Sequence, residues 1–229
     1  MEQLQNGFTL NTPPGSFPLS TDSILLAHFA KLPKNADVLD LGSGCGTLGL
    51  LLCAKDSGCT VTGVELDSTA HEAALDNIAR NGLSGRLSSI CADLRSIPSL
   101  FASGKFQICI SNPPYFPGGP ASKQTPQARR DDACSMDELV KAAAWAIRYG
   151  GDFFLVHKPE RLAKLMTLSS NAGLEPKRLQ LVRHDPSKPI SLVLLQCRKG
   201  GRPGLVMDEL TLFDEHGLPT EEYRKIYHI

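Results

Sequence analysis

Short apolar runs alternate with longer amphipathic stretches along most of the chain. The apolar runs predict seven buried strands, at residues 36–41, 60–66, 86–91, 106–111, 153–157, 180–183 and 192–198. The amphipathic stretches predict helices at residues 24–30, 48–56, 68–81, 136–149 and 160–172. Strands that alternate with helices pair in parallel and carry helices on both faces of the sheet. The pattern therefore predicts a doubly wound α/β fold.

Polar and small residues mark where these elements begin and end. Ser135 is the expected N-cap of one helix, the pair Gly150-Gly151 its expected end, and Gly173 the expected end of the next helix. The Pro- and Gly-rich stretch at 113–126 predicts a long loop, and long loops in compact domains are usually functional or disordered. We expect a single domain over residues 1–229, made of an N-terminal cap at 1–35, a core at 36–198 and a tail at 199–229.

Composition restricts the class of protein. The chain has 229 residues, of which 41% are hydrophobic and 21% charged, as in an ordinary globular protein. No apolar run approaches the roughly 20 residues of a membrane span. The first residues lack the basic start and apolar stretch of a secretion signal. We therefore expect a cytoplasmic protein without a membrane partner, and nothing in the sequence predicts an obligatory protein partner.

The seven cysteines do not have the spacing of a metal site. None of them forms a Cys-x-x-Cys pair, and several lie within apolar runs, where a thiol behaves as a small hydrophobic group. We therefore expect no bound metal. The cysteines are Cys45, Cys53, Cys59, Cys91, Cys109, Cys134 and Cys197.

Positive charge is concentrated in the second half of the chain. Lys plus Arg and Asp plus Glu number 24 each, so the net charge is zero, but residues 151–203 hold ten basic and four acidic residues. Two interpretations remain open: a solvated face, or a surface that contacts phosphates. On the second interpretation Lys158, Lys199 and Arg202 are candidate contacts.

A glycine loop follows the first predicted core strand, with the sequence Gly42-Ser43-Gly44-Cys45-Gly46. Glycines let the backbone turn sharply and approach a ligand at the end of a sheet. Asp40 lies two residues before the first of them. A carboxylate there would repel a pyrophosphate, but it suits the ammonium of S-adenosylmethionine. The loop therefore favours that cofactor over a dinucleotide.

Two further acids follow the next two strands. Glu65 stands at the end of the second core strand, where a carboxylate can accept both hydroxyls of a ribose. Asp93 follows the third strand and can accept from an adenine amine, although an aspartate there is also a natural helix N-cap.

The fourth core strand ends in Asn112-Pro113-Pro114-Tyr115. The two prolines stop the strand and fix an extended turn. The lone pair of an adenine N6 is delocalised into the ring, so the amine is a poor nucleophile. The Asn112 side-chain oxygen and the Pro113 carbonyl can accept its two hydrogens and stabilise the charge that develops on methyl transfer. Tyr115 offers a stacking face, worth about 1–3 kcal/mol.

Together these residues resemble the motif set of the class I S-adenosylmethionine-dependent methyltransferases that act on amino nitrogens. The resemblance runs from about Phe17 to Arg198. It implies a Rossmann-like sheet of seven mostly parallel strands with the last antiparallel. It also implies that the tetrapeptide holds the target amine. The implied cofactor contacts are Asp40, Gly42, Gly44, Gly46, Glu65, Asp93 and Asn112.

The flanking segments sharpen the resemblance. Residues 17–26, 128–132 and 199–205 are similar to the bacterial tRNA1(Val) adenine-37 N6-methyltransferase family. That likeness implies a tRNA substrate, RNA contacts at Arg129 and Arg130, and a role for Thr21 in closing over the cofactor. Thr21 is equally suited to be a helix N-cap, with Asp22 favouring the positive end of that helix.

Four alternatives remain. The same tetrapeptide serves enzymes that methylate a glutamine of translation release factors, but these carry an N-terminal helical domain, and only about 35 residues precede the first core strand here. DNA adenine enzymes usually need a larger recognition domain. A dehydrogenase would leave Asp40 and the tetrapeptide without a role. A non-catalytic RNA-binding subunit would not need an intact loop and tetrapeptide. We therefore predict N6-methylation of adenine in RNA, most simply in tRNA.

Overall fold

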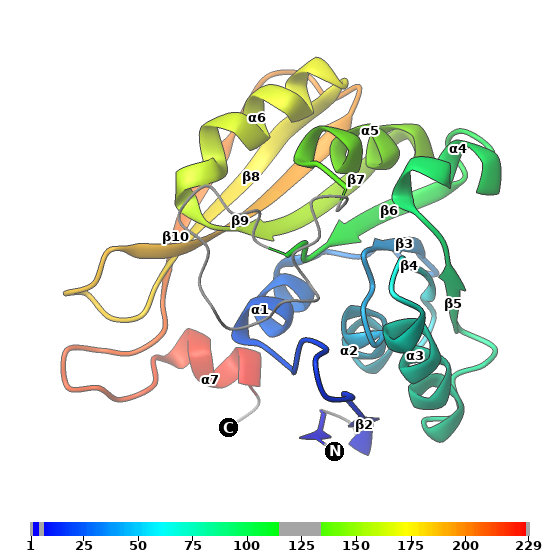
Figure 1. The fold of residues 1–229 in the computed structure, drawn as a ribbon. Coiled ribbons are helices and arrows are strands. Elements are labelled where there is room, and N and C mark those ends of the chain that lie inside the picture. Colours follow the sequence, from blue (N-terminus) through cyan, green and yellow to red (C-terminus); the bar gives the residue numbers. More distant parts are fainter. Residues whose placement is uncertain (1, 5–6, 115–133, 228–229) are drawn as a thin grey trace.

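The computed structural model describes residues 2–4, 7–114 and 134–227. Its centre is an eight-stranded sheet with the order β10-β8-β9-β7-β6-β3-β4-β5 (Figure 1). Only β9 is antiparallel to its neighbours in this sheet. The strands are β3 (Asp37–Leu41), β4 (Thr60–Glu65), β5 (Leu87–Cys91), β6 (Phe106–Ser111), β7 (Ile147–His157), β8 (Leu174–Arg183), β9 (Ile190–Lys199) and β10 (Val206–Thr211).

Helices cover both faces of the sheet, as the alternating pattern predicts (Figure 1). One face carries α1 (Thr21–Phe29), α2 (Thr47–Lys55) and α3 (Ser68–Arg80). The other face carries α4 (Ile97–Leu100), α5 (Met136–Ala146) and α6 (Leu162–Asn171), with the short 3-10 helices η2 (Leu94–Ser96) and η3 (Pro159–Arg161). Each layer encloses its own cluster of buried apolar side chains against the sheet. The α/β fold is therefore confirmed.

The sheet differs from the expected one in the number of its strands. The seven expected strands are present, and the antiparallel one, β9, lies between β7 and β8. An eighth strand, β10, is added by the tail and pairs in parallel with β8. Five of its six residues are not buried, so the segment lacks the apolar run by which the other strands are recognised.

The end of α5 also differs from the expectation. Ser135 caps the helix as predicted and forms a capping box with Glu138. The helix nevertheless ends at Ala146, and Gly150-Gly151 lie inside β7 rather than after a helix. A Cβ at Gly151 would come within 2.5 Å of the Gln107 carbonyl oxygen, so this glycine permits close strand pairing.

Both ends of α1 are anchored by side chains. At its start the Ser20 hydroxyl accepts the Ser23 amide N–H at 3.3 Å, so Ser20 rather than Thr21 is the N-cap. At its end the Lys55 ammonium of α2 donates to three carbonyls that belong to residues 27, 28 and 30, at 2.8–2.9 Å. A cation is favourable at the negative end of a helix. These contacts place the first turn of α1 at a defined position.

Two asparagines of α3 hold the N-terminal segment. Asn77 accepts the Asn11 amide N–H and donates to the Asn11 and Cys45 carbonyls at 2.8–3.0 Å. Asn81 makes the same paired contact with the backbone of Thr9, in the short strand β2 (Thr9–Leu10), which pairs with β1 (Glu2–Gln3). The segment is thereby tied to the glycine loop.

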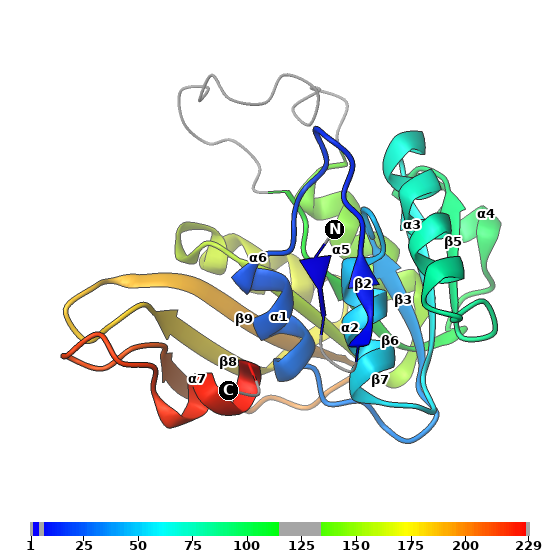
Figure 2. The ribbon, with the colours of Figure 1, turned by 90° about the horizontal axis from the view of Figure 1, so that it is seen from below.

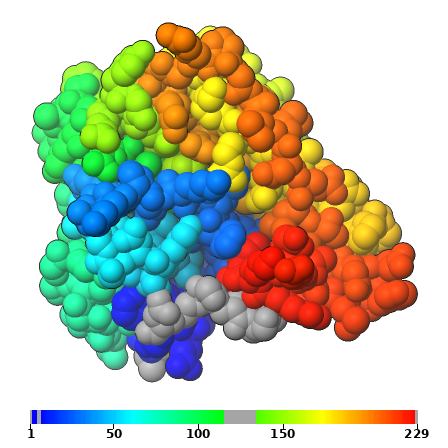
Figure 3. Space-filling view, turned by 180° about the vertical axis from the view of Figure 1, so that it is seen from behind, coloured from blue at the N-terminus to red at the C-terminus, as the bar shows by residue number. Residues whose placement is uncertain are grey.

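The C-terminal helix α7 (Glu221–Tyr227) packs against α1, although the two lie at opposite ends of the sequence (Figures 2 and 3). The phenol of Tyr227 is hydrogen-bonded to Thr21, and its ring stacks on Tyr223 with centroids 4.2 Å apart. The end of the tail, for which the sequence predicts no helix or strand, therefore reaches the first residue of α1.

Candidate functional site

The carboxyl ends of β3, β4 and β6 form one edge of the sheet. The chain order β3, β4, β5 runs outward on one side of β3, and β6 then returns to its other side. In open α/β sheets, ligands bind at such a change of direction, beyond the carboxyl ends of the strands. The residues that follow β3 and β6 are therefore the candidate site, and they are the ones predicted from the sequence.

The glycine loop after β3 is bent in a way that requires glycine. Gly42, Gly44 and Gly46 have φ values of 73°, 53° and 83°, in the left-handed region that residues with a Cβ rarely adopt. A Cβ on Gly42 or Gly44 would meet no atom of the described chain within 4 Å. Backbone is therefore exposed to open space beside the loop, as expected where a ligand approaches closely.

Asp40 is a buried carboxyl group inside β3. It is 1% exposed, and neither of its oxygens has a hydrogen-bond partner among the described residues. Burial, followed by the negative charge of Glu65, raises the pKa of Asp40 to about 8. An isolated buried carboxylate is costly, so such a group is expected to lie where a cation can neutralise it.

Glu65, at the end of β4, joins the two loops of the site. One of its oxygens accepts the Gly44 amide N–H and the other accepts the Asp67 amide N–H, both at 2.8 Å. A carboxylate oxygen has two acceptor positions, so each oxygen keeps one for a ligand. The structure therefore places Glu65 beside the glycine loop, in a state that can still accept two hydroxyl groups.

Asn112 and Pro113 come directly after β6, which pairs with β3. The Ser111 hydroxyl donates to the Leu41 carbonyl at 2.7 Å and ties the ends of these two strands together. Asn112 donates its side-chain Nδ2 to Ser23 Oγ at 3.0 Å. The glycine loop and the tetrapeptide, far apart in the sequence, thus start from adjacent strand ends.

Asp93 is engaged within the chain. It caps η2 by accepting the Arg95 amide N–H at 2.8 Å, and its two oxygens accept Arg95 Nε at 2.9 and 3.0 Å. Hydrogen bonds from Arg95 lower the pKa of Asp93, which favours the carboxylate. The helix-cap alternative for Asp93 is therefore correct, and an adenine amine would have to share this carboxylate with Arg95.

The three candidate RNA contacts that the structure describes, Lys158, Lys199 and Arg202, lie at two opposite edges of the sheet. Lys158 follows the end of β7, where its ammonium donates to the Ser191 carbonyl at 3.5 Å and lies close to Asp22. Burial raises the pKa of Asp22, and the Lys158 charge opposes this rise. Lys199 instead binds the start of β7, donating to the Ala144 and Ile147 carbonyls at 2.7 and 2.8 Å. The eleven residues of β7 separate these points by roughly 30 Å.

Most of the basic side chains at 151–203 contact other groups of the same chain. Arg202 follows β9 at the same edge as Lys199, and its carbonyl accepts from Lys177. Arg183 pairs with Glu209 and Arg198 with Asp152, and Arg178 lies over the Phe29 ring. Lys199 therefore has a structural role, and Arg202, at the same edge, lies far from an RNA bound at Asn112.

Three predicted residues, Tyr115, Arg129 and Arg130, lie outside the described residues. Within the described part, no group of three or more His, Cys, Asp or Glu is placed to hold a metal ion. None of the helices described there is both long and apolar enough to cross a bilayer.

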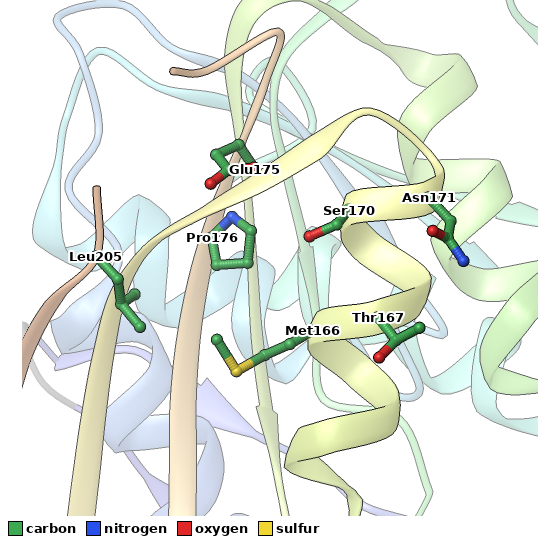
Figure 4. Close-up of a pocket in the computed structure, with 7 residues that line it drawn as sticks. All are labelled: Met166, Thr167, Ser170, Asn171, Glu175, Pro176 and Leu205. Carbon is green, nitrogen blue, oxygen red and sulfur yellow. The ribbon is translucent and has the colours of Figure 1, made fainter. Parts of the chain in front are cut away.

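A surface hollow of about 430 Å³ lies away from this site (Figure 4). Its lining comes from the end of α6, the start of β8 and Leu205. The start of β8 is at the amino edge of the parallel strands, opposite to the glycine loop. The hollow is therefore separate from the candidate site.

Ser23 and Asn77 are two residues of the site that the sequence does not predict. Ser23 contacts Asn112, and Asn77 binds the Cys45 carbonyl of the glycine loop. Both are buried, at 6% and 1% exposure, Ser23 in the largely apolar helix α1 and Asn77 on the apolar side of α3. A polar residue on the buried side of a helix is the signal that would have identified them.

Known proteins are similar to this chain in sequence and in fold. The family model described as methyltransferase small domain matches residues 19–169. A curated relative from Bacteroides fragilis is 30% identical over 191 residues, covering 82% of this chain and 80% of the relative. Another, from Christiangramia forsetii, is 25% identical over 225 residues, covering 96% and 92%. Both are named tRNA1(Val) (adenine(37)-N6)-methyltransferase.

A solved structure, described as a predicted O-methyltransferase from Agrobacterium tumefaciens, superposes with a TM-score of 0.76. It is 19% identical and covers 91% of this chain and 96% of its own. At that identity the match concerns the fold alone.

Proposed function

The chain belongs to the methyltransferase small domain family and to the family of its curated bacterial relatives, and from this premise we propose that it methylates the N6 amine of an adenine in tRNA. The methyl donor is S-adenosylmethionine. The relatives' name specifies adenine 37 of tRNA1(Val), and we propose the same substrate here. The observation that supports this best is the position of Asn112 and Pro113 beside the glycine loop, on adjacent strand ends.

The proposed cofactor site consists of Asp40, the glycine loop and Glu65. S-adenosylmethionine, when bound, supplies a methyl group on a positively charged sulfur. Asp40 suits its ammonium, because this buried carboxyl has no hydrogen-bond partner among the described residues. Glu65 keeps one acceptor position on each oxygen for the ribose hydroxyls. The bent loop at Gly42, Gly44 and Gly46 lets backbone approach the ligand.

Asn112 and Pro113 are proposed to hold the target amine. The Asn112 Oδ1 and the Pro113 carbonyl are acceptors, and an adenine amine offers two hydrogens to them. Accepting both hydrogens draws the nitrogen lone pair out of the ring and stabilises the positive charge that forms on the amine. The N–C bond forms as the C–S bond of the donor breaks, and the resulting cationic amine loses one of its protons to solvent after the transfer. With the proton lost in that order, the chemistry does not require a charged base.

The remaining contacts are proposed from their positions. Thr21 and Asp22 begin α1 near Asn112, through the contact of Ser23 with Asn112. Lys158 lies at the same edge of the sheet and is a candidate for an RNA phosphate. Tyr115 is proposed as the stacking face for the adenine, since it follows Pro114 directly. We further propose that the chain acts without an obligatory protein partner.

The proposal is tested by offering the purified protein radiolabelled S-adenosylmethionine with separate pools of tRNA, ribosomal RNA, DNA and protein. Nucleoside analysis then identifies the labelled product. We expect label in tRNA as N6-methyladenosine. Label only in protein would instead support the methylation of a glutamine amide, which poses the same lone-pair problem for Asn112 and Pro113.

A further inference from the structure

The side chain of Asn112 is held by a serine that lies 89 residues earlier in the sequence. Asn112 Nδ2 donates to Ser23 Oγ at 3.0 Å. Ser23 is in the first turn of α1 and is 6% exposed. Its Oγ is in turn 3.3 Å from Ser20 Oγ. A short hydrogen-bonded chain therefore runs from the start of α1 to the proposed amine-binding residue.

The direction of this contact matters because a carboxamide has two ends of nearly equal shape. One end donates hydrogens and the other accepts them. A target amine presents hydrogens, so it needs the oxygen end. If the Asn112 amide were reversed, its NH₂ group would face the amine of the substrate, donor against donor, and one of the two acceptors would be lost.

We propose that Ser23 is a positioning residue, which holds the Asn112 amide with Oδ1 turned toward the target amine before the substrate arrives. This inference rests on the proposed function of Asn112. Ser23 fixes the nitrogen end by accepting from Nδ2. The Ser20 and Ser23 hydroxyls are 3.3 Å apart, and either can donate to the other. When Ser23 donates to Ser20, only lone pairs of Ser23 face Asn112. The amide is then set in its acceptor orientation without contact between Ser23 and the substrate.

The N-cap hydrogen bond of α1 does not use the Ser23 hydroxyl. The N-cap contact is made by the Ser20 hydroxyl with the Ser23 backbone, and the other end is anchored by Lys55. The residues that follow Ser23, at 24–27, are all apolar. A buried hydroxyl at such a position costs free energy unless it is hydrogen-bonded. Its partner on the site side is Asn112.

Kinetics test the proposal through Ser23→Ala, with Ser23→Thr as the variant that keeps a hydroxyl. Ser169→Ala is the matched control, because Ser169 is equally buried but lies in α6 on the other face of the sheet. We expect Ser23→Ala to lower the single-turnover methyl-transfer rate about five- to tenfold, the effect of one hydrogen bond, with unchanged cofactor affinity. Ser23→Thr should retain most of the rate, and Ser169→Ala all of it.

A second measurement does not depend on the RNA substrate. The side-chain amide signals of Asn112 in a ¹⁵N spectrum are identified by their loss in Asn112→Asp. In Ser23→Ala these signals should shift and their hydrogens should exchange faster with water. Unchanged amide signals together with an unchanged rate would overturn the proposal, as would a rate loss matched by an equal loss of cofactor affinity.

The two proposals can fail separately. Absence of methyl transfer to tRNA by the wild-type protein would contradict the proposed function. The amide signals would still show whether Ser23 holds Asn112.

Discussion

The buried carboxyl group of Asp40 lies near the carboxylate of Glu65 on the neighbouring strand, and the two groups differ in the hydrogen bonds that they accept. Glu65 accepts two backbone N–H groups, whereas Asp40 accepts none from the described residues. Burial, and then the Glu65 charge, raises the pKa of Asp40 to about 8. The site thus holds a proton at neutral pH that a bound cation should displace.

Cofactor binding should therefore release a proton. At pH 7 the free protein carries Asp40 mostly protonated, because the pH is below its pKa. An ammonium beside Asp40 favours the carboxylate, so its pKa falls and about one proton leaves. Calorimetric titration with S-adenosylmethionine in two buffers of different ionisation enthalpy measures this release. Asp40→Asn should abolish it and weaken binding. A wild-type binding enthalpy that is the same in both buffers would refute the role of Asp40.

The contribution of Asp40 to the stability of the cofactor-free protein should fall as the pH rises. An unperturbed aspartate has a pKa of 3.8, whereas the pKa of Asp40 in the folded protein is about 8. Between these values the folded protein binds more protons than the unfolded chain, so the free energy of unfolding decreases with increasing pH. Urea unfolding at several pH values from 4 to 8 checks this. In Asp40→Asn, the free energy of unfolding should decrease less steeply with pH, because the contribution of Asp40 is removed. The same dependence on pH in both proteins would contradict the raised pKa of Asp40.

Asn112→Ala should separate turnover from cofactor binding. Loss of an acceptor that stabilises charge only in the transition state lowers the rate by roughly 100-fold or more. The affinity for S-adenosylmethionine should stay nearly normal. The exposed Asn171, at the end of α6, supplies the control, and Asn171→Ala should be fully active. Full activity of Asn112→Ala would remove the central residue of the proposed mechanism.

Lys158 and Lys199 should have opposite phenotypes, since they lie at opposite ends of β7. Lys158→Ala should weaken tRNA binding. The slope of log affinity against log salt concentration should become shallower by about one, as expected for the loss of one phosphate contact. Lys199→Ala removes the donor to two carbonyls and should lower the free energy of unfolding by about 1–3 kcal/mol, with tRNA affinity unchanged. Filter binding at several salt concentrations and urea unfolding distinguish the two. A loss of tRNA affinity in Lys199→Ala alone would reverse the assignment.

The core strands and the glycine loop are predictable because each carries a strong local signal. The strand at Phe106–Ser111 matches its predicted bounds, and Ser135 caps its helix as expected. β10 has one buried residue in six, so neither apolar period nor composition marks it. Gly150-Gly151 looks like a helix end in sequence, but its role depends on the distance to the partner strand.

Contacts that join distant segments are not encoded in any local pattern. The bond from Asn112 to Ser23, and the caps that Lys55 and Lys199 provide, appear only once the chain is folded. The basic residues at 151–203 illustrate the same limit. Their number can be read from the sequence, but which of them bind other groups of the chain and which face solvent cannot. The chemistry of the site is therefore more predictable than the residues that support it.

The most direct test of the central claim compares two transcripts of tRNA1(Val) that differ only at position 37, one with adenine and one with guanine. Each is incubated with the protein and S-adenosylmethionine, and the nucleosides are identified by mass spectrometry. We expect N6-methyladenosine in the adenine transcript and none in the guanine transcript. Equal methylation of both transcripts would contradict the proposed position. No methylation of either, with S-adenosylmethionine demonstrably bound, would contradict the proposed substrate.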